Sequence, residues 1–453
     1  MSHLSDLAKI ACEAAKKAGA DAADAYLTTS RQLSVDVFNR KPESFEKADV
    51  AGAGIRVWRD KATGYAYTTI LSTAGMAAAA RSAFENAAAA DGDEFNGLPD
   101  ETGASADISG LDLTGKAYAA ATTTEKIDFA LVMEDTAFLT DPRVKGCESV
   151  AYAEEETTVA LANTRGFAGE YTRQVCYGFI DVLAEEKGET QTGFYYAAGH
   201  SLAELDAAAT GREAAQRAVA MLGGHSIKPK RLTAVFDPLV FIQILTAISP
   251  AFSADAAQKG RSFLASATGE KVGAEKLSLI DDGRLPAGLG TAPFDDEGVP
   301  TRLTPVIQDG VLTTFLFNTY AARKEKREPT GNGRRGSFKM PPGTSPTNLY
   351  VKPGTLSRGE LFSGVSDGIY VLGLQGLHAG VSPVTGQFSA GAFGLTIKNG
   401  ELAGPVREVT IASTCRDILA NIVAIADDLT FVPMGAAYGA PTVAVENVVI
   451  SGR

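Results

Sequence analysis

One order of predicted elements occurs twice within the first 225 residues, and it limits the possible folds more than any other feature. In the first copy, apolar residues fall at helical spacing over residues 4–18, and Gly19 follows them as a stop signal. An Ala-rich helix, capped by Ser72 or Thr73, is predicted to run to about Ala90. Between these helices the sequence predicts four short strands, at residues 25–29, 33–38, 54–59 and 64–69.

The second copy begins with a predicted helix over about residues 124–139 and ends with an Ala-rich helix over about residues 202–221. Four strand candidates lie between them, at residues 144–153, 157–162, 173–185 and 191–198. The two copies predict an internal pseudo-repeat of helix and sheet layers, with a chance likeness as the alternative. The stretch 91–114, rich in Gly, Asp and Ser, is predicted to be a linker.

After Lys228-Pro229 the chain changes character. A strand at residues 232–236, a helix from Pro238 to about Ile248 and a second helix at 417–426 are predicted among many strands and turns. Asp309-Gly310 lies between two apolar runs of residues 301–320, which predicts a hairpin with a type I′ turn. Further strands are predicted at residues 368–373, 391–397 and 441–450, with a tight turn at Asn399-Gly400. The predicted fold class is α+β: α/β layers at the N-terminus, then a large, mostly antiparallel β domain. The predicted domains are 1–95, 96–228 and 229–453.

Composition limits the functional classes. Of 453 residues, 45% are apolar and 21% charged, as in folded globular proteins, and the net charge of −12 argues against a dedicated nucleic-acid binder. The four cysteines lie far apart without a C-x-x-C pair, which favours buried thiols in a reducing compartment. With no apolar leader and no run of 18 apolar residues, we expect a cytoplasmic protein that does not enter membranes.

Familiar catalytic motifs are absent. The one G-x-G-x-x-G, at Gly331–Gly336, is followed by a segment with two prolines that cannot open a helix, so nucleotide binding is not expected. None of the four histidines lies three or four residues from another, which excludes H-E-x-x-H. His200 and His225 are expected at the surface. His378, in the Gly-bracketed turn 376–380, is a candidate for contact with a ligand or partner, the alternative being a solvated turn.

Three charged segments allow two interpretations each. Asp295-Asp296-Glu297 and Asp281-Asp282 are either acid/base groups or solvated acidic turns. Arg323–Lys339, a basic segment in an acidic protein, is either a docking loop for an acidic partner or peptide carboxylate, or a solvated loop.

Four sequence blocks together resemble the TldD/PmbA family of metallopeptidase subunits, specifically its PmbA (TldE) branch. The likeness is dense from about residue 230 onward and looser over Leu33–Ala90. The blocks are Asp296–Arg302 before the Asp-Gly hairpin, Thr319–Lys324 followed by Thr330–Asn332, Leu374–Ser389, and Ala440–Thr442.

The resemblance implies a cytoplasmic two-subunit peptidase that acts on peptides or unfolded segments. In that family the TldD partner holds the metal, expected to be zinc, with an H-E-x-x-x-H helix and a late cysteine. Here the corresponding helix is about Phe241–Lys259, with the two histidine positions near Leu245 and Ser249 and the cysteine position near Met434–Ala437. All three ligands are missing, so we expect this chain to hold no metal and to supply no catalytic residue of its own.

Three functional hypotheses follow. The first is a non-metal subunit that pairs with a TldD-like partner and binds peptide as an added strand. The second is a non-enzymatic adaptor that presents a peptide or modulates a DNA-processing complex. The third is a self-sufficient hydrolase using Asp296 or Glu297 with a metal. The candidate substrate-binding residues are Gly376, His378, Gly380, Gly391, Asp296 and Glu297.

Overall fold

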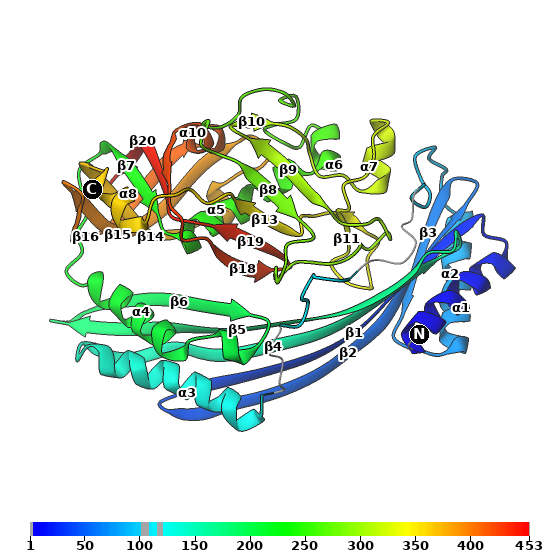
Figure 1. The fold of residues 1–453 in the computed structure, drawn as a ribbon, viewed down its shortest axis with the longest axis horizontal. Helices are drawn as coiled ribbons and strands as arrows, with labels where there is room; N and C mark the ends of the chain where they lie inside the picture. Colours follow the sequence, from blue (N-terminus) through cyan, green and yellow to red (C-terminus); the bar gives the residue numbers. More distant parts are fainter. Residues whose placement is uncertain (1–2, 101–107, 116–120, 453) are drawn as a thin grey trace.

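The computed structural model describes residues 3–100, 108–115 and 121–452, and it confirms the α+β class (Figure 1). A long, curved antiparallel sheet with four helices lies beside a C-terminal domain that is built from two further six-stranded sheets. No helix of these described residues combines the length and the apolar composition that a membrane crossing requires.

The first sheet has the strand order β3-β2-β1-β4-β5-β6 and is antiparallel throughout. Its strands are β1 (Ala22–Phe38), β2 (Lys41–Arg59), β3 (Ala62–Thr68), β4 (Val144–Asn163), β5 (Ala168–Glu186) and β6 (Glu189–Gly199). Its helices are α1 (His3–Ala18), α2 (Thr73–Ala88), α3 (Thr123–Thr140) and α4 (Ala207–Ala220), with a short 3-10 turn η1 (Leu202–Glu204) before α4. Residues of both predicted N-terminal domains therefore share one sheet.

The order of elements is helix, three strands, helix in both halves, and the sheet is symmetric about the β1–β4 pair. The prediction of four strands per half was wrong, because 25–29 and 33–38 belong to one strand, β1, and 144–153 and 157–162 belong to β4. The predicted breaks fall at polar residues such as Ser30 and Glu155, which line a cavity on one face of continuous strands. Likewise, residues 41–49 are mostly exposed on β2, so they lack the apolar alternation that marks a half-buried strand.

Both halves share an unusually close approach between a strand and a helix. A Cβ added at Gly64 in β3 would lie 2.0 Å from the carbonyl oxygen of Ala83 in α2. A Cβ added at Gly193 in β6 would lie 2.3 Å from the carbonyl oxygen of Ala214 in α4. Because the same contact occurs at the corresponding strand of each half, the pseudo-repeat extends from element order to packing.

We therefore expect Gly64→Ala and Gly193→Ala each to lower the free energy of unfolding by about 1–3 kcal/mol, since the added methyl group must displace helix backbone. Urea denaturation followed by circular dichroism measures the change. Gly404→Ala is the matched control, because a Cβ there would meet nothing within 4 Å on an exposed strand. If both variants changed the free energy of unfolding as little as Gly404→Ala does, the close packing would be contradicted.

Alternating side chains divide the first sheet into two faces. On β1, Leu27 and Val35 point toward the helices, where they join two apolar clusters, one with α1 and α2 and one with α3 and α4. Tyr26 points to the opposite face and packs in a cluster with Phe294 and Phe338 of the C-terminal domain. The helices thus cover one face, and the C-terminal domain covers part of the other.

The C-terminal domain contains two sheets with the orders β10-β9-β8-β13-β19-β18 and β16-β15-β14-β7-β20-β17. In the latter sheet β16 also pairs with β20, which closes β16, β15, β14, β7 and β20 into a barrel. The β8-containing sheet of this domain consists of β8 (Leu279–Asp282), β9 (Leu303–Gln308), β10 (Val311–Leu312), β13 (Asn348–Val351), β18 (Thr430–Met434) and β19 (Ala436–Ala440). The barrel sheet consists of β7 (Lys230–Phe236), β14 (Asp367–Gln375), β15 (Gln387–Lys398), β16 (Glu401–Thr414), β17 (Ile422–Ile425) and β20 (Val443–Ser451). A two-stranded ribbon pairs β11 (Gly333–Arg334) with β12 (Gly343–Thr344).

Helix α5 (Pro238–Ile248) packs against β14 of one sheet and β19 of the other, within the largest apolar core. The shorter helices are η2 (Ser249–Phe252), α6 (Ala254–Gln258), α7 (Thr319–Lys324), α8 (Arg358–Ser363), α9 (Leu377–Gly380) and α10 (Cys415–Ala420).

The predicted turns of this domain are confirmed. Asp309 and Gly310 both have positive φ, 50° and 82°, between β9 and β10, and Asn399 and Gly400 turn in the same way between β15 and β16. The helix predicted at 417–426 was wrong beyond residue 420, where β17 begins after one residue. The predicted linker also differs: Leu98 and Leu111 are buried, while residues 101–107 lie outside the described part.

Candidate functional site

A cavity of about 600 Å³ lies between the open face of the first sheet and the C-terminal domain. Strands β1, β4 and β5 form one wall, and the segment around β11 and the β18–β19 turn form the other. Its polar and aromatic lining includes Tyr26, Thr28, Ser30, Gln32, Glu155, Thr157, Tyr171, Arg173, Asp296, Arg334, Arg335, Phe338, Met434 and Tyr438. The volume is typical of small-molecule and peptide sites.

The sheet wall is polar because every second residue of β1 points into the cavity. Ser30 donates to Glu155 Oε1 over 2.5 Å, and Gln32 Nε2 donates to the same oxygen over 3.0 Å. Burial raises the pKa of Glu155, but these hydrogen bonds and the nearby Arg173 guanidinium outweigh it, so the pKa lies below its usual value. Glu155 is therefore a charged carboxylate that already has donors.

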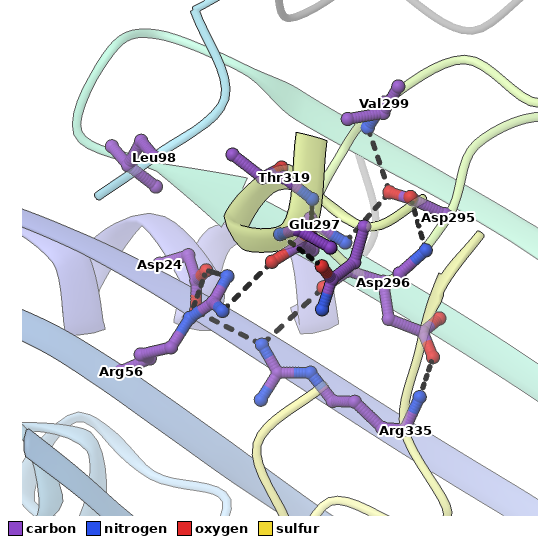
Figure 2. Close-up of polar contacts among 12 residues, drawn as sticks. Asp24, Arg56, Leu98, Asp295, Asp296, Glu297, Val299, Thr319 and Arg335 are labelled. Carbon is purple, nitrogen blue, oxygen red and sulfur yellow. Dashed lines mark hydrogen bonds and ion pairs between the residues drawn. The ribbon is translucent and has the colours of Figure 1, made fainter. Parts of the chain in front are cut away.

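The opposite wall carries two adjacent arginines from the basic segment. The Arg335 side chain is fully buried and donates to Asp24 Oδ1 over 3.1 Å (Figure 2). It also donates to the Tyr65 hydroxyl over 3.2 Å. Its guanidinium also lies 5.1 Å from the ring centroid of Tyr26. For Arg335 the solvated-loop interpretation of Arg323–Lys339 was wrong, because this side chain is buried between the first sheet and the C-terminal domain.

The acidic turn 295–297 is also buried, so of its two interpretations the solvated turn was wrong. Arg56 on β2 donates to Asp24 Oδ2 at 2.5 Å and to Glu297 Oε1 at 3.0 Å, and all three side chains are almost fully buried (Figure 2). Glu297 Oε2 accepts from the backbone N–H of Thr319 over 2.7 Å. Glu297 thus joins the C-terminal domain to the first sheet through a buried ion pair.

The neighbouring carboxylates hold the same turn in place. Asp295 Oδ1 accepts from the N–H groups of Glu297 and Val299, and its Oδ2 accepts from Gly333 at 2.7 Å. Burial and the Glu297 carboxylate raise the pKa of Asp295 above its usual value, against these three donors. Asp296 Oδ2 accepts from the Arg335 N–H over 2.7 Å and lines the cavity. Asp281, in the second acidic pair, is likewise buried, and burial raises its pKa to about 6.

The other four candidates lie in a different region, on the barrel. Gly376 has a φ of +76° and precedes α9, and His378 in α9 is exposed. A Cβ at Gly380 would lie 1.7 Å from the Ser389 carbonyl oxygen, so this glycine lets α9 lie on β15. Gly391 pairs with Gln375 in β14. Among the described residues, no hydrogen bond, ion pair or shared cavity lining joins this group to Asp296 or Glu297.

Of the two surface predictions for histidines, one is confirmed and one was wrong. His225 is exposed, as predicted, but the surface prediction for His200 was wrong. His200 is buried, and its Nδ1 lies 2.6 Å from the carbonyl oxygen of Gln174. The polar residues beside His200 in the sequence did not reveal that its ring lies against the backbone of β5.

Sequence reasoning missed most of the strand wall of the cavity, including Tyr26, Glu155 and Arg173, whereas Arg334 lies in the basic segment 323–339 that it had singled out. The only local signal was the alternation of polar residues along β1 and β4 beside apolar neighbours. Their common location depends on contact between strands and a loop more than 150 residues later.

Two of the three implied metal-ligand positions lie at or next to this cavity: Met434–Ala436 line it, and Ser249 contacts Tyr438, which also lines it. Leu245 is buried in the core, and the Ser249 hydroxyl lies 3.1 Å from the Tyr438 hydroxyl. Met434–Ala437, which includes the β18–β19 turn, offers neither a thiolate nor an imidazole. An apolar side chain and an engaged hydroxyl do not suit zinc. In the described part of the chain, no group of three or more His, Cys, Asp or Glu side chains is arranged to hold a metal ion.

Family comparisons cover most of the chain. Models of the PmbA/TldA metallopeptidase match as domain 1 over residues 23–87, as the central domain over 117–222 and as the C-terminal domain over 229–452. Metalloprotease PmbA of Escherichia coli O157:H7 is 26% identical over 90% of this chain and 88% of its own length. A PmbA homologue of Haemophilus influenzae is 27% identical over 94% of this chain and 92% of its own length.

Solved structures agree with this fold. A Thermotoga maritima crystal structure has a TM-score of 0.87 and 28% identity, covering 98% of this chain and 99% of its own. TldE from Thermococcus kodakarensis has a TM-score of 0.89 at 22% identity, covering both chains completely, which is a likeness of fold alone.

Proposed function

Because the chain belongs to the PmbA/TldA metallopeptidase family, on its PmbA branch, we propose that it is the non-metal subunit of a cytoplasmic peptidase complex. Its partner would be a TldD-like subunit that holds zinc. The substrate would be a peptide or an unfolded segment of a protein. Nucleic acid is not part of the proposal, because the chain carries a net charge of −12.

One observation carries the proposal: the positions implied for metal ligands carry side chains that do not bind zinc, and two of the three lie at or next to the cavity. Leu245 packs in the apolar core, and Ser249 contacts Tyr438, which lines the cavity. Met434 is more than half exposed there, at 53%. A family member with this lining can bind and enclose peptide while the chemistry takes place on its partner.

The proposal assigns binding and enclosure to this chain. The open face of β1, β4 and β5 offers hydroxyl, amide and aromatic groups along an extended surface. Such a surface suits an extended chain without requiring one particular sequence. The barrel loop with Gly376, His378 and Gly380 stays a second candidate for contact with substrate or partner.

The experiment co-expresses this chain with the histidine-bearing paralogue of its host and measures cleavage of an unfolded peptide, together with zinc content. We expect cleavage only when both chains are present, with about one zinc per pair and none on this chain alone. Each chain alone and the pair treated with a chelator are the controls.

Three outcomes would contradict the proposal in different ways. Stoichiometric zinc and cleavage by this chain alone would favour the self-sufficient hydrolase. A partner whose cleavage rate never changes when this chain is added would favour the adaptor. Failure to recover any complex of the two chains would contradict the proposed two-subunit peptidase.

A further inference from the structure

Two arginines of the cavity form no direct ion pair with a carboxylate among the described residues. Arg173 and Arg334 both line the cavity, and neither takes part in any ion pair within 4 Å among the residues that the structure describes. In addition, Nη1 of Arg334 is buried without a hydrogen-bond acceptor. Buried guanidinium groups normally find acceptors, because leaving a buried charge unpaired is costly.

The other charged groups of the lining already have partners. Arg335 pairs with Asp24, and Glu155 accepts from Ser30 and Gln32. Asp296 accepts from the backbone N–H of Arg335. Glu155 and Asp296 interact with Arg173 and Arg334 electrostatically but not as direct ion pairs, so each wall of the cavity carries one guanidinium without a direct carboxylate acceptor among the described residues.

We propose that this cavity binds the carboxylate of a short peptide between Arg173 and Arg334. The planar guanidinium group offers paired N–H donors in the geometry that a carboxylate accepts. Tyr26 and Tyr171 stand on the same lining and exclude water from the pair, which strengthens the interaction. A volume of about 600 Å³ leaves room for a few residues of chain beyond the carboxylate.

The charge of the lining favours a single carboxylate over a doubly charged group. The lining carries Arg173, Arg334 and Arg335 with Glu155 and Asp296, and Arg335 is already paired with Asp24 just outside the lining. A bound carboxylate therefore adds one negative charge beside Arg173 and Arg334. A phosphate dianion would add two negative charges to the same buried space.

The inference deepens the proposed function and rests on it, because it names the group by which this subunit would hold a peptide. The carboxylate can come from the end of a peptide or from an acidic side chain. The binding experiment separates these two sources and needs no partner subunit.

The test titrates the full chain alone with four probes in a calorimeter: tetra-alanine with a free carboxyl end, the same peptide as its amide, an acetylated Ala-Asp-Ala amide, and inorganic phosphate. We expect the free acid to bind at least about 10-fold more tightly than the amide, since the amide removes the charged acceptor. Binding of the Asp peptide in place of the free acid would assign the site to acidic side chains. Phosphate should not compete at equal concentration.

Two variants locate the binding. Arg334→Gln and Arg173→Gln are each expected to weaken the preferred probe at least about 10-fold. Arg261→Gln is the matched control, because Arg261 is exposed and lies outside this lining. Circular dichroism checks folding, and the comparison of acid with amide on the unchanged chain does not depend on any variant.

Equal binding of the acid, the amide and the Asp peptide would overturn the inference while leaving peptide binding, and so the proposed function, intact. Retention of tight binding by both arginine variants would also overturn it. Absence of binding by every probe would refute the carboxylate site, whereas the proposed function is decided separately by the cleavage assay with the partner.

Discussion

Replacing Arg56 by methionine is expected to lower the free energy of unfolding by about 3–5 kcal/mol, because it breaks a buried ion pair and leaves carboxylates without a counter-charge. Among the described residues, Arg56 on β2 is the only side chain that forms an ion pair with Glu297, and Arg56 shares Asp24 with Arg335. Methionine keeps much of the side-chain volume, so the loss reports on charge rather than on a cavity. Urea denaturation measures it.

Two comparisons make the result specific. Arg416→Met removes an ion pair with Glu270 in which both side chains are about half exposed, so it should change stability by less than about 1 kcal/mol. Adding Glu297→Gln to Arg56→Met should restore part of the lost stability, since one unpaired charge disappears. If Arg56→Met were as mild as Arg416→Met, the buried network would not hold the two domains together.

Asp237→Ala is expected to have an effect of similar size, about 3–5 kcal/mol, at a second junction of the same two parts. Asp237 is fully buried and pairs with Arg217 of α4 over 2.8 Å. It also accepts from the Tyr370 hydroxyl over 2.6 Å and caps α5 through the Leu239 N–H. Its removal therefore leaves a buried cation, an unpaired hydroxyl and an uncapped helix.

The controls for Asp237→Ala remove one partner at a time. Tyr370→Phe deletes only the hydroxyl and should cost about 1–2 kcal/mol. Glu213→Ala removes the partly exposed second partner of Arg217 and should cost less than about 1 kcal/mol. If Asp237→Ala cost no more than Tyr370→Phe, the ion pair would contribute nothing to stability.

Local patterns predicted those parts of the fold whose causes are local. Asp309-Gly310 and Asn399-Gly400 form tight turns because their backbone takes positive φ, which these residue types tolerate. The repeated order of helices and strands was visible as well. The predicted number of strands was wrong where Ser30 and Glu155 interrupt the apolar alternation of β1 and β4. The alternation rule assumes that one face of a strand meets the core and the other meets water.

The candidate site was harder to predict, because its groups are paired across long distances in the chain. Glu297 lies 241 residues from Arg56, so its sequence neighbourhood resembles a solvated acidic turn. Arg334 and Arg335 belong to a basic run whose other members are mostly exposed. No local pattern distinguishes a buried arginine from an exposed one in such a run.

The symmetric sheet has a consequence for synthesis on the ribosome. Strand β1 pairs with β4 over thirteen positions, from Asp24 with Asn163 to Asp36 with Ala151, although more than one hundred residues separate them. A nascent chain that has emerged only through α2 would expose the whole edge of β1, where unsatisfied backbone groups invite pairing with another nascent copy. The first half of this protein therefore depends on prompt arrival of the second to avoid self-association.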